Sequence, residues 1–404
     1  MKAVMYGGGN IGRGFIGMLF SRSGYEVTFV DVAEPVVNAL NERRSYMLRY
    51  VSSEGSEDVK IENVCAVNGN DTALVAERIA EADIMATAVG VRILKFIIPN
   101  LVAGIRARKA SGRGPLNIII CENLIDADKL VRSMIEAELN EEEKAWFSEN
   151  IGLVEASIGR MVPVQTEEMK DGDPLRVCVE SYGYLPVDKA AFKGQIPEIK
   201  NMIPYEPFSY YIQRKLYVHN MGHAICAYLG NYLKLDYIYQ SIAVADVKLV
   251  VENAMLESIL ALSKEYGTDM KDLITHIRNL VARFSNKALK DTCARVGNDP
   301  ERKLAPTDRL IGSAKLAVKH GLCPAYIFAG AAAGVYQYLN EKELEQTPAH
   351  AEQVLKTVSG LTDEADAVRE GILALYPLYV KGADMAEIQR AAELLQQEKT
   401  PVIA

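Results

Sequence analysis

The amino-acid sequence predicts an α/β protein in which a parallel sheet wound with helices precedes a mainly α-helical domain. In the first half, short apolar, β-branched runs alternate with segments that have apolar residues at three- and four-residue spacing. After residue 194 this alternation stops, and long helical patterns continue to the end. A chain of 404 residues is too long for one ordinary core. We therefore expect two domains, 1–194 and 195–404.

The order of the predicted elements supports this division. Strand–helix alternation implies parallel strands with helices on both faces of the sheet. The six predicted strands are Lys2–Tyr6, Val27–Asp31, Ile84–Val89, Leu116–Cys121, Gly152–Ala156 and Leu175–Glu180. Helical patterns between the strands include Ile11–Arg22 and Thr72–Glu81. The predicted helices of the second half are Phe208–Leu229, Ala243–Tyr266, Lys271–Asn286, Leu310–His320, Ala325–Leu339 and Met385–Gln397.

The composition argues against several classes of protein. A net charge of −8 disfavours a nucleic-acid or anionic-membrane surface, which needs clustered positive charge. No run approaches the roughly 18 apolar residues of a membrane span, and Gly7 comes too early for a signal peptide. The six cysteines include no Cys-x-x-Cys pair. We expect a cytoplasmic protein with reduced thiols, a monomer or small homo-oligomer, that binds neither nucleic acid nor membrane.

A glycine-rich turn follows the first predicted strand. Gly7 would permit the tight turn, Gly9 would let the backbone approach a pyrophosphate, and Gly12 would let the next helix pack close to the strand. The helix N-terminus would offer its unpaired N–H groups to the pyrophosphate. These features predict a Rossmann-type dinucleotide-binding domain whose turn is Gly7-Gly8-Gly9-Asn10-Ile11-Gly12.

Asp31, at the end of the second predicted strand, points to NAD as the cofactor. Its carboxylate can accept hydrogen bonds from the adenosine ribose hydroxyls and would repel a 2′-phosphate. The residues that follow, Val32 to Pro35, include no arginine to receive such a phosphate. The alternative is a turn and a surface aspartate that bind nothing, or bind a different nucleotide.

A polar stripe lies early in the helical half. At about 100° per residue, Lys215, His219 and His223 fall within about 80° of one another, and Asn220 lies about 140° from Lys215. Hydride transfer from an alcohol needs a base for the hydroxyl proton and donors for the developing alkoxide. Burial of a lysine favours the neutral form that can act as that base. We expect Lys215 to be the acid–base group and Asn220 and His223 to contact the oxygen.

Two other interpretations of this stripe remain open. His219 and His223 have the i, i+4 spacing of zinc ligands on a helix, but Asn220 stands where a metalloprotease has glutamate. No third ligand is evident, so we expect no metal. The stripe could instead be structural and hydrogen-bond the first domain, with His219 the more structural of the two histidines.

The motifs as a group resemble the polyol-specific long-chain dehydrogenases, the mannitol dehydrogenase family. The similarity extends from residue 1 through residue 312. Its blocks are Gly7–Gly17, Lys215-Leu-x3-Asn-x2-His223, Arg283-Phe-Ser-Asn-x2-Leu-x-Asp-Thr-x2-Arg-Val296, Cys121-Glu-Asn-Leu124, Ser157-Ile-Gly-Arg-Met-Val-Pro163 and Asp299-Pro-Glu-Arg-Lys-Leu304.

The resemblance implies a metal-independent reaction between D-mannitol 1-phosphate and D-fructose 6-phosphate with NAD, in the phosphate-specific branch of the family. It implies a catalytic lysine at Lys215, with Asn220 and His223 polarising the substrate oxygen. It also matches Asn123 to an asparagine at the carboxyl end of the sheet, where we expect a further cofactor contact. Family members that act on unphosphorylated mannitol carry an aspartate in the block before Val-Pro, where this sequence has Gly159.

The substrate phosphate needs positive charge. The stretch 283–309 holds seven basic and four acidic residues, a local excess of positive charge in an acidic chain. Arginine binds phosphate bidentately and lysine acts as a point charge. We expect Arg302 and Lys303 to bind the phosphate, with Arg295 behind them. The alternative is that these residues form ion pairs on helix surfaces.

The sequence thus predicts an NAD-dependent sugar-phosphate oxidoreductase with its active site in the cleft between the two domains. Two alternatives stay open. One is a hexuronate reductase or free-polyol dehydrogenase of the same family. The other is an NAD(H)-sensing regulator without catalysis, although a sensor has no need of the Lys215, Asn220 and His223 set.

Overall fold

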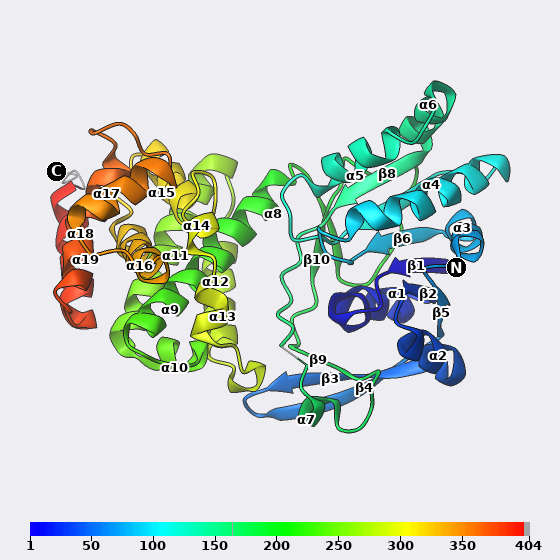
Figure 1. The fold of residues 1–404 in the computed structure, drawn as a ribbon, viewed down its shortest axis with the longest axis horizontal. Coiled ribbons are helices and arrows are strands. Elements are labelled where there is room, and N and C mark those ends of the chain that lie inside the picture. The colour runs from blue at the N-terminus through cyan, green and yellow to red at the C-terminus, as the bar shows by residue number, and fades with distance from the viewer. Residues whose placement is uncertain (164, 400–404) are drawn as a thin grey trace. The chain divides into compact units, whose positions relative to one another are not determined.

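The chain divides into two compact units, Met1–Tyr211 and the part from Ile212 onward (Figure 1). The computed structural model describes residues 1–163 and 165–399. The predicted boundary near residue 194 lies inside the first unit, and as a boundary between folding domains it stays a prediction. In the described chain, no helix combines the length and the apolar character that a membrane span needs.

The first unit is built on a six-stranded sheet in which every neighbouring pair is parallel. This confirms the predicted Rossmann-type α/β fold. The strand order reverses between β1 and β6, and in open α/β sheets such a reversal is where ligands bind, at the carboxyl ends of the strands. The strands, in sheet order, are β5 (Val64–Asn68), β2 (Glu26–Asp31), β1 (Lys2–Tyr6), β6 (Ile84–Thr87), β7 (Leu116–Ile120) and β8 (Ile151–Glu155).

Alternate residues of these strands enter two separate cores, one on each face of the sheet. Ala3 and Met5 of β1 join one core, while Val4 and Tyr6 join the other. Because both faces are covered, the central strands are mostly apolar. The first core is covered by α1 (Gly17–Arg22) and α2 (Glu34–Arg43), and the second by α3 (Thr72–Glu81), α4 (Leu94–Ala110), α5 (Ala127–Glu136) and α6 (Glu141–Asn150).

Five further strands lie outside the main sheet. The predicted strand Leu175–Glu180 contains β9, which pairs with β3 and not with the six-stranded sheet. The hairpin of β3 and β4 was not among the predicted elements. The three-stranded sheet consists of β4 (Gly55–Glu62), β3 (Ser45–Ser52) and β9 (Val177–Val179), and the two-stranded sheet of β10 (Leu185–Asp188) and β11 (Met202–Tyr205).

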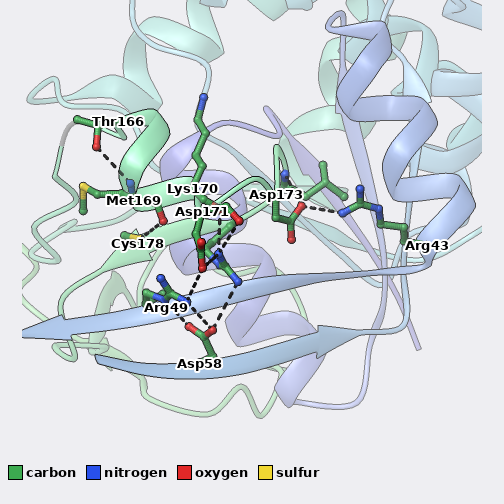
Figure 2. Close-up of polar contacts among 11 residues, drawn as sticks. Arg43, Arg49, Asp58, Thr166, Met169, Lys170, Asp171, Asp173 and Cys178 are labelled. Atoms are coloured by element: carbon green, nitrogen blue, oxygen red, sulfur yellow. Dashed lines mark hydrogen bonds and ion pairs between the residues drawn. The ribbon is translucent and has the colours of Figure 1, made fainter. Parts of the chain in front are cut away.

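An ion-pair network fixes this hairpin to the short helix α7 (Glu167–Lys170) and to the end of α2 (Figure 2). Arg49 and Asp58 face each other across β3 and β4, and the guanidinium donates to both carboxylate oxygens at 2.6 and 2.8 Å. Asp171, just after α7, lies 3.5 Å from Arg49, and Asp173 pairs with Arg43 at 2.6 Å. The network connects segments that are more than 100 residues apart in the chain.

The second unit is helical. The single predicted helix Phe208–Leu229 consists of three pieces: α8 (Ser209–Arg214), a π-helical turn η2 (Lys215–Asn220) and α9 (Met221–Tyr232). The remaining helices are α10 (Ile238–Ala243), α11 (Ala245–Tyr266), α12 (Met270–Phe284), the 3₁₀ turn η3 (Lys287–Leu289), α13 (Cys293–Gly297), α14 (Pro300–Lys303), α15 (Ile311–Lys319), α16 (Ala325–Glu341), α17 (Pro348–Thr357), α18 (Ala367–Val380) and α19 (Met385–Lys399).

The alanine- and glycine-rich helix α16 is the centre of this unit and packs against α9, α11, α18 and α19. A Cβ added at Gly330 would lie 2.4 Å from the Ile225 side chain of α9, so the small residues allow close approach. The buried Glu257 of α11 accepts hydrogen bonds from the backbone N–H groups of Tyr326 and Ile327 and from the Gln396 amide. Burial raises the pKa of Glu257 to about 8.

The packing of α3 on α4 predicts the effect of one glycine substitution. A Cβ at Gly104 would lie 2.5 Å from Cβ of Ile79, a contact that requires a backbone shift. We expect Gly104→Ala to lower the free energy of unfolding by about 1–3 kcal/mol, because the clash outweighs the gain in helix propensity.

Gly114→Ala is the matched control, because an added Cβ there has no neighbour within 4 Å and the backbone is not left-handed. Urea denaturation of both variants tests the contact. Equal stabilities of the two variants would contradict tight packing at Ile79.

Candidate active site

The glycine turn after β1 has no room for side chains at two positions. Gly7 has a φ of +101°, and a Cβ there would lie 2.5 Å from the carbonyl oxygen of Ala88. A Cβ at Gly12 would lie 1.8 Å from the carbonyl oxygen of Gly7. Gly9, by contrast, has no atom near an added Cβ, and Asn10 beside it is exposed. Ile11 then leads into the helix. The turn is therefore closed on the protein side and open where a ligand would approach.

A hydrogen bond connects the Asp31 side chain to this turn. Its Oδ2 accepts from the backbone N–H of Gly8 at 2.8 Å, and its Oδ1 accepts from Ala33 N–H at 2.9 Å. A carboxylate has about four lone-pair sites, so capacity remains for ribose hydroxyls. The second hydrogen bond also fixes the chain that leaves β2.

Two buried arginines that the sequence analysis did not select hold the helix after the turn. This helix begins as a π-helical turn, η1 (Gly12–Ile16). Arg160 donates to the carbonyl oxygen of Gly14 at 2.8 Å and lies over the Phe15 ring at 4.7 Å. Arg13 donates to the carbonyl oxygen of Leu175, and burial lowers its pKa. Arg160 stood in the family-like block Ser157–Pro163, so a signal for it existed.

The carboxyl ends of β6 and β7 are joined by a second carboxylate. Buried Glu122 accepts from the N–H groups of Val89 and Gly90 at 3.0 and 2.8 Å. It thereby fixes the turn after β6, where Gly90 has a φ of +91°. Asn123 follows directly and is exposed at this edge of the sheet. The predicted cofactor residues of β1, β2 and β7 thus come to the same edge.

Glu155, at the end of β8, is also part of this edge. It accepts a hydrogen bond from Asp126 N–H at 3.0 Å. Burial raises the pKa of Glu155 to about 7, and the nearby negative charge of Asp128 adds to the effect.

The predicted catalytic residues lie on the π-helical turn η2 and the start of α9. The N–H of Met221 bonds to the carbonyl of Leu216, five residues back. Because a π turn holds more residues than an α turn, Lys215 and Asn220 come closer to one line than an α-helix would place them. Lys215, Asn220 and His223 are all partly exposed, whereas His219 is buried.

Asp291, which the sequence analysis did not select, lies against His223. Its Oδ2 is 3.1 Å from Nε2 of His223, within the distance of an ion pair. The His223 ring stacks on Phe284 at 4.8 Å. Although burial opposes it, His223 and Arg295 lower the pKa of Asp291. Asp291 and Phe284 therefore fix the orientation of the imidazole.

Positive charge gathers around the catalytic turn. Burial lowers the pKa of His219 well below its usual range, and Arg283, His223, His276 and Lys215 act in the same direction. Burial likewise lowers the pKa of His276, together with Arg214 and Arg283. Arg214 and Arg283 were not among the predicted phosphate residues. Most of these groups lie on the continuous segment of α8, η2 and α9, whereas His276 and Arg283 come from α12 and reach it only through the fold.

The three predicted phosphate residues have different surroundings. Arg295 pairs with Asp291, and Arg302 with Asp299 at 2.7 Å. Lys303 is buried, and its Nζ lies 3.4 Å from the Asn298 side-chain oxygen. Burial lowers the pKa of Lys303 to about 8, and Arg309 and Arg302 add to the effect. As phosphate contacts these three residues remain proposals.

In the described part of the chain, no group of three or more His, Cys, Asp or Glu is arranged to hold a metal ion. His219 and His223 have ring centroids 6.1 Å apart, and the Asp291 carboxylate lies against His223.

Known proteins resemble the chain over nearly its full length. A family model described as the mannitol dehydrogenase Rossmann domain matches residues 1–201, and one described as the mannitol dehydrogenase C-terminal domain matches residues 208–382. A D-sorbitol dehydrogenase in substrate-free form is similar at a TM-score of 0.81 and 14% identity, with 96% of this chain and 94% of that chain covered.

A second solved structure is Pseudomonas fluorescens mannitol 2-dehydrogenase in a ternary complex with NAD and D-mannitol. It is similar at a TM-score of 0.73 and 14% identity, with 98% of this chain and 94% of that chain covered. At 14% identity the two solved structures show that the fold is shared. Membership of the family rests on the two family models.

The carboxyl edge yields a prediction about pH. The pKa of Glu155 is about 7 in the folded chain and about 4.3 in an unfolded one, so ionisation of Glu155 opposes folding. The loss of stability begins above the unfolded pKa and is complete above pH 7. We expect Glu155→Gln to remove this loss, with a gain on the order of 1 kcal/mol at pH 8 relative to pH 5, because partial exposure screens the charge.

Thermal unfolding at both pH values, with Glu149→Gln on the exposed side of α6 as control, measures the difference. The control should follow the wild type at both pH values. A parallel pH dependence of Glu155→Gln and the wild type would show that Glu155 is ionised without penalty.

Proposed function

Because the chain belongs to the mannitol dehydrogenase family, we propose that it is an NAD-dependent polyol dehydrogenase that interconverts D-mannitol 1-phosphate and D-fructose 6-phosphate. The observation that supports a phosphorylated substrate is the presence of basic residues around the catalytic turn. Together with burial, Arg283 and Lys215 lower the pKa of His219, and Arg214 and Arg283 lower that of His276. Such surroundings favour an anionic substrate over a neutral polyol.

The residues at the sheet edge fit the cofactor. The open side of Gly9 leaves space for a pyrophosphate at the backbone, and Gly7 and Gly12 hold the turn in shape. Asn10, Ile11 and Asn123 complete the proposed contacts, and Asp31 would accept from the ribose hydroxyls. NAD supplies the hydride chemistry when bound.

Lys215 is the proposed acid–base group. In the reduction of fructose 6-phosphate, its ammonium gives a proton to the oxygen on C2, and in the reverse reaction its amine takes the hydroxyl proton. Asn220, one π turn later, and His223 donate hydrogen bonds to the same oxygen as negative charge develops on it. Asp291 keeps the His223 ring in position for this contact. No metal enters the proposed reaction.

Gly159 supports the phosphate-specific assignment. Family members that act on free mannitol are expected to carry an aspartate in this block. Here a Cβ at position 159 would lie 3.1 Å from the Tyr182 ring, so a longer side chain has little room. Arg295, Arg302 and Lys303 remain proposed phosphate contacts beside Arg214 and Arg283.

The substrate assignment is tested by following NADH oxidation with fructose 6-phosphate, fructose and a hexuronate in parallel, each with and without EDTA. We expect kcat/KM for fructose 6-phosphate to exceed the other two by at least about 100-fold, with no effect of EDTA. This ratio corresponds to about 2.7 kcal/mol of discrimination, within reach of a charged contact. Faster turnover of fructose or of the hexuronate would contradict this assignment and place the protein in another branch of the family.

Lys215→Ala tests the acid–base role. We expect kcat to fall by about 10²- to 10⁴-fold, the usual contribution of a positioned proton donor, while NADH still binds with wild-type affinity by fluorescence titration. Lys248→Ala, on the exposed side of α11, is the control and should keep wild-type kcat. A Lys215→Ala variant that retains its activity would refute this mechanism, and NADH binding without turnover in the wild type would indicate a sensor.

A further inference from the structure

The turn that follows β6 is held by a side chain from the neighbouring strand. Glu122 is the second residue after β7, and it is only 6% exposed. Its Oε1 accepts from the N–H of Val89 at 3.0 Å, and its Oε2 accepts from the N–H of Gly90 at 2.8 Å. Both oxygens of the carboxylate therefore bind two successive backbone groups of one turn.

The turn after β6 in turn packs against the glycine turn after β1. A Cβ at Gly7 would lie 2.5 Å from the carbonyl oxygen of Ala88 and 3.2 Å from Cγ1 of Val89. The N–H of Ala88 also donates to the carbonyl oxygen of Tyr6 at 2.9 Å. The contacts thus run in a row along the carboxyl edge of the sheet, because Glu122 fixes the β6 turn and the β6 turn packs on Gly7.

The order of the strands indicates which part of the cofactor the β6 turn would meet. A dinucleotide lies across the point where the strand order reverses, with one mononucleotide on each side. That point is between β1 and β6. Asp31, on β2, is the proposed contact of the adenosine ribose. The nicotinamide half would therefore lie on the side of β6 and β7, where Glu122 holds the turn.

We propose that Glu122 is a positioning residue for the nicotinamide half of NAD(H). It acts through the N–H groups of Val89 and Gly90, which hold the β6 turn in place, and it need not touch the cofactor. Two successive N–H groups of a turn can form a nest that binds an anion. Because Glu122 fills this nest, the pyrophosphate is left to the glycine turn after β1. The inference rests on the cofactor site of the proposed function and is independent of the substrate.

Binding of NADH without substrate tests this role. Glu122→Gln keeps the size of the side chain, but an amide has one acceptor oxygen, and its NH2 group would face the other backbone N–H. We expect the Kd of NADH, from fluorescence titration, to rise at least about 10-fold, the effect of losing a hydrogen bond to a charged group. AMP occupies only the adenosine half, so its affinity, measured by competition with NADH, should stay within about twofold of the wild type.

Glu149→Gln makes the same chemical change at an exposed position on α6 of the same unit. It should bind both NADH and AMP as the wild type does.

A second variant changes the turn and leaves the carboxylate in place. Gly90 has a φ of +91°, which L side chains rarely adopt, and an added Cβ there has no neighbour within 4 Å among residues 1–163 and 165–399. Gly90→Ala therefore acts through the backbone. We expect it to raise the Kd of NADH and to spare AMP, as Glu122→Gln does.

Gly112→Ala is the matched control for this backbone strain. Gly112 has a φ of +69°, and within the described chain an added Cβ is equally free of neighbours. It precedes β7 and so lies at the amino end of that strand, away from the carboxyl edge. Gly112→Ala should therefore bind NADH with wild-type affinity.

The outcomes separate this role from a general structural one and from the proposed function. An unchanged Kd of NADH in either Glu122→Gln or Gly90→Ala overturns the assignment of Glu122. An equal loss of NADH and AMP binding also overturns it, because the damage would then extend to the whole sheet edge. If Glu122→Gln fails to fold, Gly90→Ala and its control decide. A wild type that binds NADH but does not prefer fructose 6-phosphate overturns the proposed substrate alone.

Discussion

The close approach of two backbone segments at Gly7 and Gly12 is the constraint on which the first unit depends. A Cβ at Gly12 would sit 1.8 Å from the Gly7 carbonyl oxygen, so no other residue fits without moving the strand or the helix. This contact sets where the helix begins relative to β1. Asp31 then fixes the turn from β2, and Arg160 fixes the helix from a segment almost 150 residues later. These contacts all hold the turn from the protein side. Gly9 therefore stays open on the other side, where a ligand would approach.

The main sheet could be predicted because its strands are buried on both faces and are mostly apolar. Leu116 to Ile120, for example, is fully buried and could hardly be anything but a central strand. The hairpin of β3 and β4 could not be predicted on this basis. Most of β4 is exposed and polar, and its pairing depends on the Arg49–Asp58 contact, whose register is unknown before folding. The same holds for β9, whose partner strand precedes it by more than 120 residues.

The candidate catalytic residues were identifiable because they stand close together in sequence, but their geometry was not. An α-helical projection separates Lys215 from Asn220 by about 140°, and the π turn reduces that separation. Asp291 and Arg283 could not be selected by spacing, because they come from segments about 70 residues after the catalytic turn. Both did stand in one family-like block, and that was the available signal.

A count of charges along the sequence could locate the basic region. It could not show which of its residues would bind an anion. The stretch 283–309 has an excess of positive charge, yet Arg295 and Arg302 pair with carboxylates only three or four residues away. Asp291 serves both Arg295 and His223, so this arginine contributes to holding the imidazole. Arg283 acts together with burial to lower the pKa of two histidines, His219 and His276. A basic residue with a local carboxylate partner is already compensated. Which basic residues pair in this way is decided only in the folded chain, so a count of charges along the sequence cannot identify the residues that would bind an anion.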